Sequence, residues 1–177
     1  GGSPVLIPAV IQAEDFDLGG QGIAYHDLTP QNDSGAYRSS EAVDIKPTSD
    51  ADGGFDLTGI ESGEWLEYTF ELVENDRYSI SLRLSNAVAG GQVSFSIDGQ
   101  VVNSGTLIPI NGESGPWQTL SIPDIDITAG KHVLRMTFSS MPSGADSTAV
   151  NWLSFDLMPR IGPDANAGPD ISLTDQD

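Results

Sequence analysis

The chain has 177 residues, with 26 acidic and 7 basic side chains and a net charge of −19 at pH 7. Such a charge disfavours nucleic acid and anionic membrane surfaces as partners, because both are bound by clustered lysine and arginine. Cysteine is absent, which excludes disulfides, thiolate zinc sites and cysteine nucleophiles. No apolar run approaches the roughly 20 residues that span a bilayer.

The first predicted element is a strand over Ile11–Phe16 that leads into a loop. Gln12 and Glu14 are two residues apart, so they lie on the same face of that strand. A hard cation such as calcium takes six to eight oxygen ligands, of which this pair could supply two. The alternative is that Glu14 caps the loop.

Two aromatic residues follow in loop-like segments, Tyr37 after Ser34-Gly35-Ala36 and Trp117 after Gly115-Pro116. Flat aromatic faces stack on the C–H faces of sugar rings, while nearby polar groups bond the hydroxyls. The alternative is that both rings pack within the protein.

Between and after these loops, apolar residues alternate with polar ones. The pattern is typical of strands with one buried and one solvated face. Asp98-Gly99 predicts a tight hairpin turn between two such strands. The alternating runs begin at Leu66, Tyr78, Val93 and His132. Many short antiparallel strands predict an all-β fold, a two-sheet β-sandwich or jelly roll.

The pattern divides the chain into three parts. Residues 1–8 form a short lead-in, residues 9–159 form the predicted β-sandwich, and residues 160–177 are rich in Gly, Pro and Asp. This composition predicts a linker leading towards a further domain.

No catalytic motif is evident. The chain has no Gly-x-Ser-x-Gly elbow, no His-Glu-x-x-His helix and no phosphate-binding glycine loop. His132 falls on the apolar side of a strand, where a structural role is expected, and His26 lies in a predicted loop. Carboxylate pairs are abundant, but in so acidic a chain their number does not support a glycosidase acid/base pair.

The chain resembles the family 6 carbohydrate-binding modules, β-sandwich domains of bacterial polysaccharide-degrading enzymes. The likeness covers roughly residues 9–158, and the order of its segments carries it. The main segments are Ile11-Gln12-Ala13-Glu14-Asp15-Phe16, Gly35-Ala36-Tyr37-Arg38, Gly63-Glu64-Trp65-Leu66-Glu67-Tyr68, Gly115-Pro116-Trp117 and Val150-Asn151-Trp152.

This resemblance implies a structural calcium ion (Ca2+) near the first strand. The matching ligands are Gln12, Glu14, Asp156 on the last strand and the backbone carbonyl of Arg38. Arg38 would act only through its carbonyl, because its guanidinium repels a cation.

The resemblance also implies a sugar site in a cleft formed by loops at one end of the sandwich. Tyr37 and Trp117 would flank the sugar, and Asn151 at the base would bond its hydroxyls. Asn32 and Asp33, in the loop before Tyr37, would add further hydrogen bonds.

The leading hypothesis is therefore a non-catalytic module that binds a polysaccharide or oligosaccharide and targets an attached glycoside hydrolase to it. The module is expected to be monomeric within a secreted, extracellular bacterial enzyme, in a setting compatible with a marine origin. The chain has only seven basic residues, and this scarcity favours a neutral glycan, such as agarose or another algal galactan, a β-glucan or xylan. The alternatives are a small β-sandwich glycosidase or lyase, and a structural or adhesion domain without a sugar site.

Overall fold

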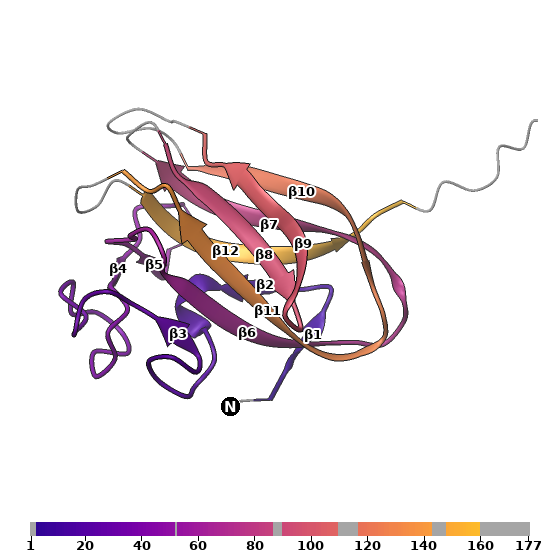
Figure 1. Ribbon diagram of the computed structural model, residues 1–177, viewed down its shortest axis with the longest axis horizontal. Coiled ribbons are helices and arrows are strands. Elements are labelled where there is room, and N and C mark those ends of the chain that lie inside the picture. Colours follow the sequence, from indigo (N-terminus) through magenta and orange to yellow (C-terminus); the bar gives the residue numbers. More distant parts are fainter. Residues whose placement is uncertain (1–2, 52, 87–89, 110–116, 143–147, 160–177) are drawn as a thin grey trace, which may run out of the picture.

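The protein is a sandwich of two β-sheets, each with six strands. The computed structural model describes residues 3–51, 53–86, 90–109, 117–142 and 148–159. Figure 1 shows the two sheets stacked face to face, with β4 and β5 at one end. The predicted all-β sandwich is confirmed. The predicted linker at 160–177 lies outside the described residues.

The first sheet has the order β1-β6-β11-β8-β9, and β3 also pairs with β6. β1 runs parallel to β6, whereas the other pairs are antiparallel. The strands are β1 (Val5–Ile7), β3 (Tyr25–His26), β6 (Trp65–Leu72), β8 (Gln92–Ile97), β9 (Gln100–Leu107) and β11 (Gly130–Ser139).

The second sheet has the order β10-β7-β12-β5-β4, and β2 also pairs with β12. The last strand, β12, therefore lies in the middle of this sheet and contacts three other strands. The strands are β2 (Val10–Gln12), β4 (Ile45–Pro47), β5 (Phe55–Leu57), β7 (Asp76–Asn86), β10 (Gln118–Ile127) and β12 (Thr148–Leu157).

The core lies between the sheets and follows the alternation predicted from sequence. Apolar residues of β6, β7, β8 and β11 are buried on the inner faces. Phe70 of the first sheet meets Phe155 of the second, with ring centroids 4.5 Å apart. His132 packs against Phe70 and bonds Asp98 through its ring Nδ1, which agrees with the expected structural role.

The β8–β9 connection is the tight turn predicted at Asp98-Gly99. Ile97 pairs with Gln100, so only two residues form the turn. Both have positive φ, 50° for Asp98 and 77° for Gly99, as a type I′ hairpin requires. The turn fixes the register of two neighbouring strands.

The opening segment differs from its prediction. β2 ends at Gln12, and Ala13–Asp15 forms a single 3-10 turn, η1. The two side chains therefore do not share a strand face, since Gln12 is exposed whereas Glu14 is buried. Among the described residues, no helix is long and apolar enough to cross a membrane.

Candidate functional site

The hairpin formed by β4 and β5 organises one end of the sandwich. Its tip is closed by hydrogen bonds from Thr48 N to Gly54 O and from Gly53 N to Asp50 O. The indole Nε1 of Trp117 donates to Ser49 Oγ at this tip, over 3.2 Å. Trp117 is partly exposed, so its ring is fixed at one point while part of its surface faces solvent.

Asn151 lies beside the same tip, at an irregularity in β12. Val150 pairs with Leu84 and Trp152 with Arg83, so Asn151 is an extra residue between two consecutive pairs. Such a bulge re-aims a side chain. The Asn151 amide is fully buried, and its Nδ2 donates to Asp50 Oδ2 over 3.1 Å.

Asp50 is held by Arg83, from the adjacent strand β7. Arg83 donates from Nε to Oδ2 over 2.7 Å and from Nη2 to Oδ1 over 2.8 Å. This paired geometry is the strong form of an arginine–carboxylate contact. The Arg83 hydrogen bonds, with a smaller effect from Asn151, lower the pKa of Asp50 to about 2.

Three residues with buried side-chain oxygens, Glu14, Asp56 and Asn151, lie near the point where β12 changes partner from β2 to β5. Trp152 pairs with Gln12 and Val150 with Leu57, so the two antiparallel registers bring Asn151 beside η1 and beside Asp56. η1 packs on both β12 and β5. Asn151 Oδ1 and Glu14 Oε2 are both buried without a hydrogen-bond partner. Asp56, at 1% exposure, completes this group.

The buried carboxylate of Glu14 is electrostatically unfavourable as it stands. Burial is the main cause that raises its pKa above 4.5, and the charges of Asp15 and Asp56 raise it further. Hydrogen bonds from the backbone of Glu14 and Phe55 act in the opposite direction. A divalent cation would neutralise two nearby carboxylates and satisfy the unpartnered oxygens, so these residues fit a calcium ion.

The structure places the other proposed calcium ligands differently. Asp156 lies four residues along β12 from Trp152, the partner of Gln12, or about 13 Å at the usual rise per residue. Its Oδ2 accepts from Ser154 Oγ. The register thus separates Asp156 from Glu14 and puts Asp56 there instead. The Arg38 carbonyl accepts from the Glu41 amide over 3.0 Å.

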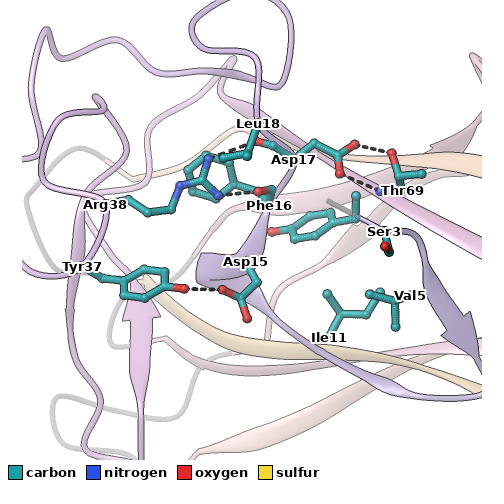
Figure 2. A pocket seen from close by; sticks show the side chains of 11 residues that line it. Ser3, Val5, Ile11, Asp15, Phe16, Asp17, Leu18, Tyr37, Arg38 and Thr69 are labelled. Atoms are coloured by element: carbon teal, nitrogen blue, oxygen red, sulfur yellow. Dashed lines mark hydrogen bonds between the residues drawn. The ribbon is translucent and has the colours of Figure 1, made fainter. Parts of the chain in front are cut away.

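The guanidinium of Arg38 stabilises the backbone that follows η1. It donates to the carbonyls of Phe16 and Asp17, and its carbon lies 3.5 Å from the centroid of the Phe16 ring. Figure 2 shows this stack together with the dashed contacts. Glu41 neutralises the Arg38 charge over 2.6 Å. Arg38 therefore supports the turn that carries Glu14.

Tyr37 belongs to a different pocket from Trp117. Its hydroxyl donates to Asp15 Oδ1 over 2.6 Å, and its ring stacks on Phe55 at 5.2 Å. Figure 2 shows Tyr37 and Asp15 pointing toward each other in a pocket of about 290 Å³. Neither Trp117 nor Asn151 lines this pocket. Both aromatic residues nevertheless contact the β4–β5 hairpin, Tyr37 at Phe55 and Trp117 at Ser49.

Asn32 and Asp33 differ in their availability to a ligand. Asn32 is buried, accepts from the amides of Gly35 and Ile45 and donates to the carbonyl of Ala36. These bonds engage both ends of its side chain and shape the loop before Tyr37. Asp33 is exposed and accepts from Gln31 over 3.0 Å.

Sequence reasoning missed Ser49, Asp50 and Asp56. They lie in or beside the short β4–β5 hairpin, where strands of three residues give no clear alternation. The weak available signal was a cluster of turn residues around Ser49-Asp50 and Gly53-Gly54.

The model of the carbohydrate binding module family 6 matches residues 34–157, well over half of the chain. The chain therefore belongs to this family, as its sequence resemblance indicated. Modules of the family bind carbohydrate without catalysis and commonly hold a structural calcium ion.

Clotting factor G alpha subunit of Tachypleus tridentatus is 25% identical over 127 residues. Those residues make up 71% of this chain but 18% of that protein.

Solved structures share the fold. A carbohydrate-binding module of Cellvibrio mixtus lichenase 5A, in complex with cellotriose, has a TM-score of 0.61 at 22% identity, covering 86% of this chain and 98% of its own. A β-1,3-glucan-binding module from Bacillus halodurans has a TM-score of 0.61 at 21% identity with the same coverage. A Clostridium cellulolyticum module in complex with xylose has a TM-score of 0.58 at 17% identity, covering 85% and 98%.

Proposed function

We propose that this module binds a neutral polysaccharide through the surface around Trp117. The observation that carries this proposal is the position of Trp117, whose indole is tied to Ser49 on a hairpin that Asp50 and Arg83 brace. A fixed, partly exposed indole stacks on a sugar ring with little loss of side-chain freedom. Similar modules in complex with cellotriose and xylose support a β-glucan or a xylan as the ligand class.

Charge supports a neutral ligand over a sulfated one. Four arginines of the described residues each bind an acidic side chain: Arg38, Arg77, Arg83 and Arg135. Their charge is therefore already compensated, within a chain of net charge −19. A polyanion would be repelled by such a protein. Agarose remains within the proposed class because it is neutral.

Even weak binding by the module would help a catalytic domain attached to it. A module linked to a catalytic domain raises the local concentration of that domain at its substrate, even with modest affinity. We therefore propose that the module targets a secreted glycoside hydrolase to its polysaccharide. Tyr37 and the exposed Asp33 would contact a chain that extends from Trp117 along the β4–β5 hairpin.

The calcium ion is proposed to bind Glu14, Asp56 and Asn151. Within the described ranges, no group of three or more His, Cys, Asp or Glu side chains is arranged to hold a metal. The proposed site instead combines two carboxylates with one amide oxygen, and backbone carbonyls and water would complete the six to eight ligands of calcium. When bound, the ion supplies charge neutralisation inside the fold and no reaction chemistry.

Affinity electrophoresis against cellulose derivatives, β-1,3-glucan, xylan, agarose and carrageenan tests the sugar proposal. Retention by a neutral glycan that is lost in Trp117→Ala supports it. Trp65→Ala is the matched control, because Trp65 lies on the other sheet, with Arg135 stacked over its ring. If only Trp65→Ala lost retention, the sugar-binding site would lie on the sheet face that carries Trp65. Release of reducing sugar would instead favour an enzyme.

A further inference from the structure

A continuous set of contacts links the proposed calcium site to Trp117, at the proposed sugar-binding surface. Asn151 Nδ2 bonds Asp50 Oδ2 over 3.1 Å, and the adjacent residue Ser49 accepts from the Trp117 indole over 3.2 Å. The opposite end of the Asn151 amide, Oδ1, is a buried oxygen without a partner. The Asn151 side chain therefore joins a buried, unpartnered oxygen to the hairpin tip that holds Trp117.

The orientation of the Asn151 amide is determined by its neighbour. Only the NH2 end of the amide can donate to a carboxylate, so the bond to Asp50 leaves Oδ1 directed away from it. Because Oδ1 is an acceptor, it suits a cation or a donor. The register on either side of the irregularity in β12 places Asn151 beside η1 and Asp56.

Asp50 itself is unavailable as a calcium ligand. Its Oδ1 accepts from Arg83 Nη2 and from the Ala51 amide, and its Oδ2 accepts from Arg83 Nε and Asn151. Its side chain is 3% exposed. Both oxygens are thus committed, and the contacts join the hairpin tip to β7 and β12.

We propose that Asp50 is a positioning residue that couples cation binding at Asn151 to the placement of Trp117. The inference rests on the proposed function. A cation bound at Asn151 Oδ1 would polarise the amide and so make Nδ2 a stronger donor to Asp50. The hairpin tip is then held more firmly, and Ser49 holds the Trp117 indole in a fixed position. The sugar then binds an indole ring that is already ordered, so less side-chain freedom is lost on binding.

Thermodynamic linkage makes this coupling measurable from both sides. If calcium raises sugar affinity by some factor, the sugar must raise calcium affinity by the same factor. Couplings of this kind usually lie between about 5-fold and 150-fold. We expect a coupling near the lower end of this range, about tenfold.

The test uses the whole chain labelled with 5-fluorotryptophan. The chain has three tryptophans, so their fluorine NMR signals are assigned by single Trp→Phe substitutions. Calcium chloride is titrated with and without cellotriose or a β-1,3-glucan, and melting temperature is recorded in parallel. In the wild type, calcium should shift the Trp117 signal and tighten sugar binding about tenfold.

Asp50→Asn should break the coupling while leaving a calcium-dependent rise in melting temperature. Asp124→Asn is the matched control, since Asp124 also pairs with an arginine, Arg77, and lies away from the hairpin. If Asp50→Asn does not fold, Ser49→Ala serves instead, because it leaves the contact of Asp50 with Arg83 intact. Restoration of the Trp117 shift by Ser49→Thr would show that the hydroxyl carries the coupling.

The outcomes separate the inference from the proposed function. An unchanged Trp117 signal on calcium addition, or an equal shift in Asp50→Asn, overturns the coupling. No calcium-dependent rise in melting temperature in the wild type overturns both the calcium assignment and the coupling. If no glycan binds, the proposed function fails, while the calcium-dependent Trp117 shift still decides whether Asp50 couples the two positions.

Discussion

The amide of Asn151 and the carboxylate of Asp50 are joined by a hydrogen bond of 3.1 Å, although the two residues are 101 positions apart. This bond fastens the tip of the β4–β5 hairpin to the centre of the second sheet. Asp50 is buried, and Arg83 binds both of its oxygens. The hairpin that carries Ser49 thus depends on one carboxylate.

Asp50→Ala is expected to destabilise the fold by about 3 kcal/mol. Removal of one partner from a buried ion pair costs about 3–5 kcal/mol, since the other charge stays buried. Arg83 keeps 24% of its side-chain exposure, which favours the lower end. Urea unfolding measures the change, with Asp124→Asn as the control, because that pair is exposed and asparagine tolerates the positive φ of 64° at this position. A loss below 1 kcal/mol in Asp50→Ala would contradict the role of this contact.

Calcium removal is expected to lower the melting temperature by roughly 5–10 °C. This is the shift for a domain of this size when the free calcium concentration is about 100 times the Kd of the site. Glu14→Gln should reduce that calcium response, because it removes one ligand charge. In chelator the same variant should be at least as stable as the wild type, since it also removes a buried, unneutralised carboxylate. Differential scanning calorimetry measures both effects. An equal calcium response in Glu14→Gln would place the ion elsewhere.

The strands, their inner faces and candidate site residues such as Trp117 and Glu14 could be named from sequence, whereas the contacts that hold them could not. In β6, Leu66, Tyr68 and Phe70 alternate with polar residues because one face of the strand is buried. The loops near Asn32 and Glu64 are instead stabilised by side-chain bonds to distant backbone groups. Such bonds leave no periodic pattern in the sequence. The position of Asn151 depends on a strand irregularity, which the pattern of β12 does not reveal.

Stability should fall as pH rises from about 4.5 to about 7, and Glu64 should contribute to this fall. Glu64 is 6% exposed, and burial, assisted by the charges of Asp27 and Glu61, raises its pKa from 4.5 to about 7. In this window the folded protein holds a proton that the unfolded chain releases, so stability is greater at the acidic end. The full effect is roughly 3 kcal/mol.

Glu64→Gln tests this assignment through the slope of stability against pH. The carboxylate accepts from the amides of Leu28 and Glu61, so glutamine loses part of this bonding at every pH. Its pH slope between about 4.5 and 7 should nevertheless become shallower, with a remaining slope from Glu14 and Asp27, whose pKa values burial also raises. Glu71→Gln, on the exposed outer face of β6, should keep the wild-type slope. A slope unchanged in Glu64→Gln would assign the titration to another group.

Sugar binding by the wild type should change less than twofold between low salt and about 0.5 M NaCl. A neutral glycan forms no ion pairs, and stacking on Trp117 is not screened by salt. Isothermal titration calorimetry of cellotriose at several NaCl concentrations measures the dependence. Trp117→Ala should weaken binding at least tenfold at every salt concentration, because a stacked aromatic contributes more than 1 kcal/mol. Affinity that drops steeply with added salt would instead indicate a charged polysaccharide, recognised by basic residues despite the acidity of the chain.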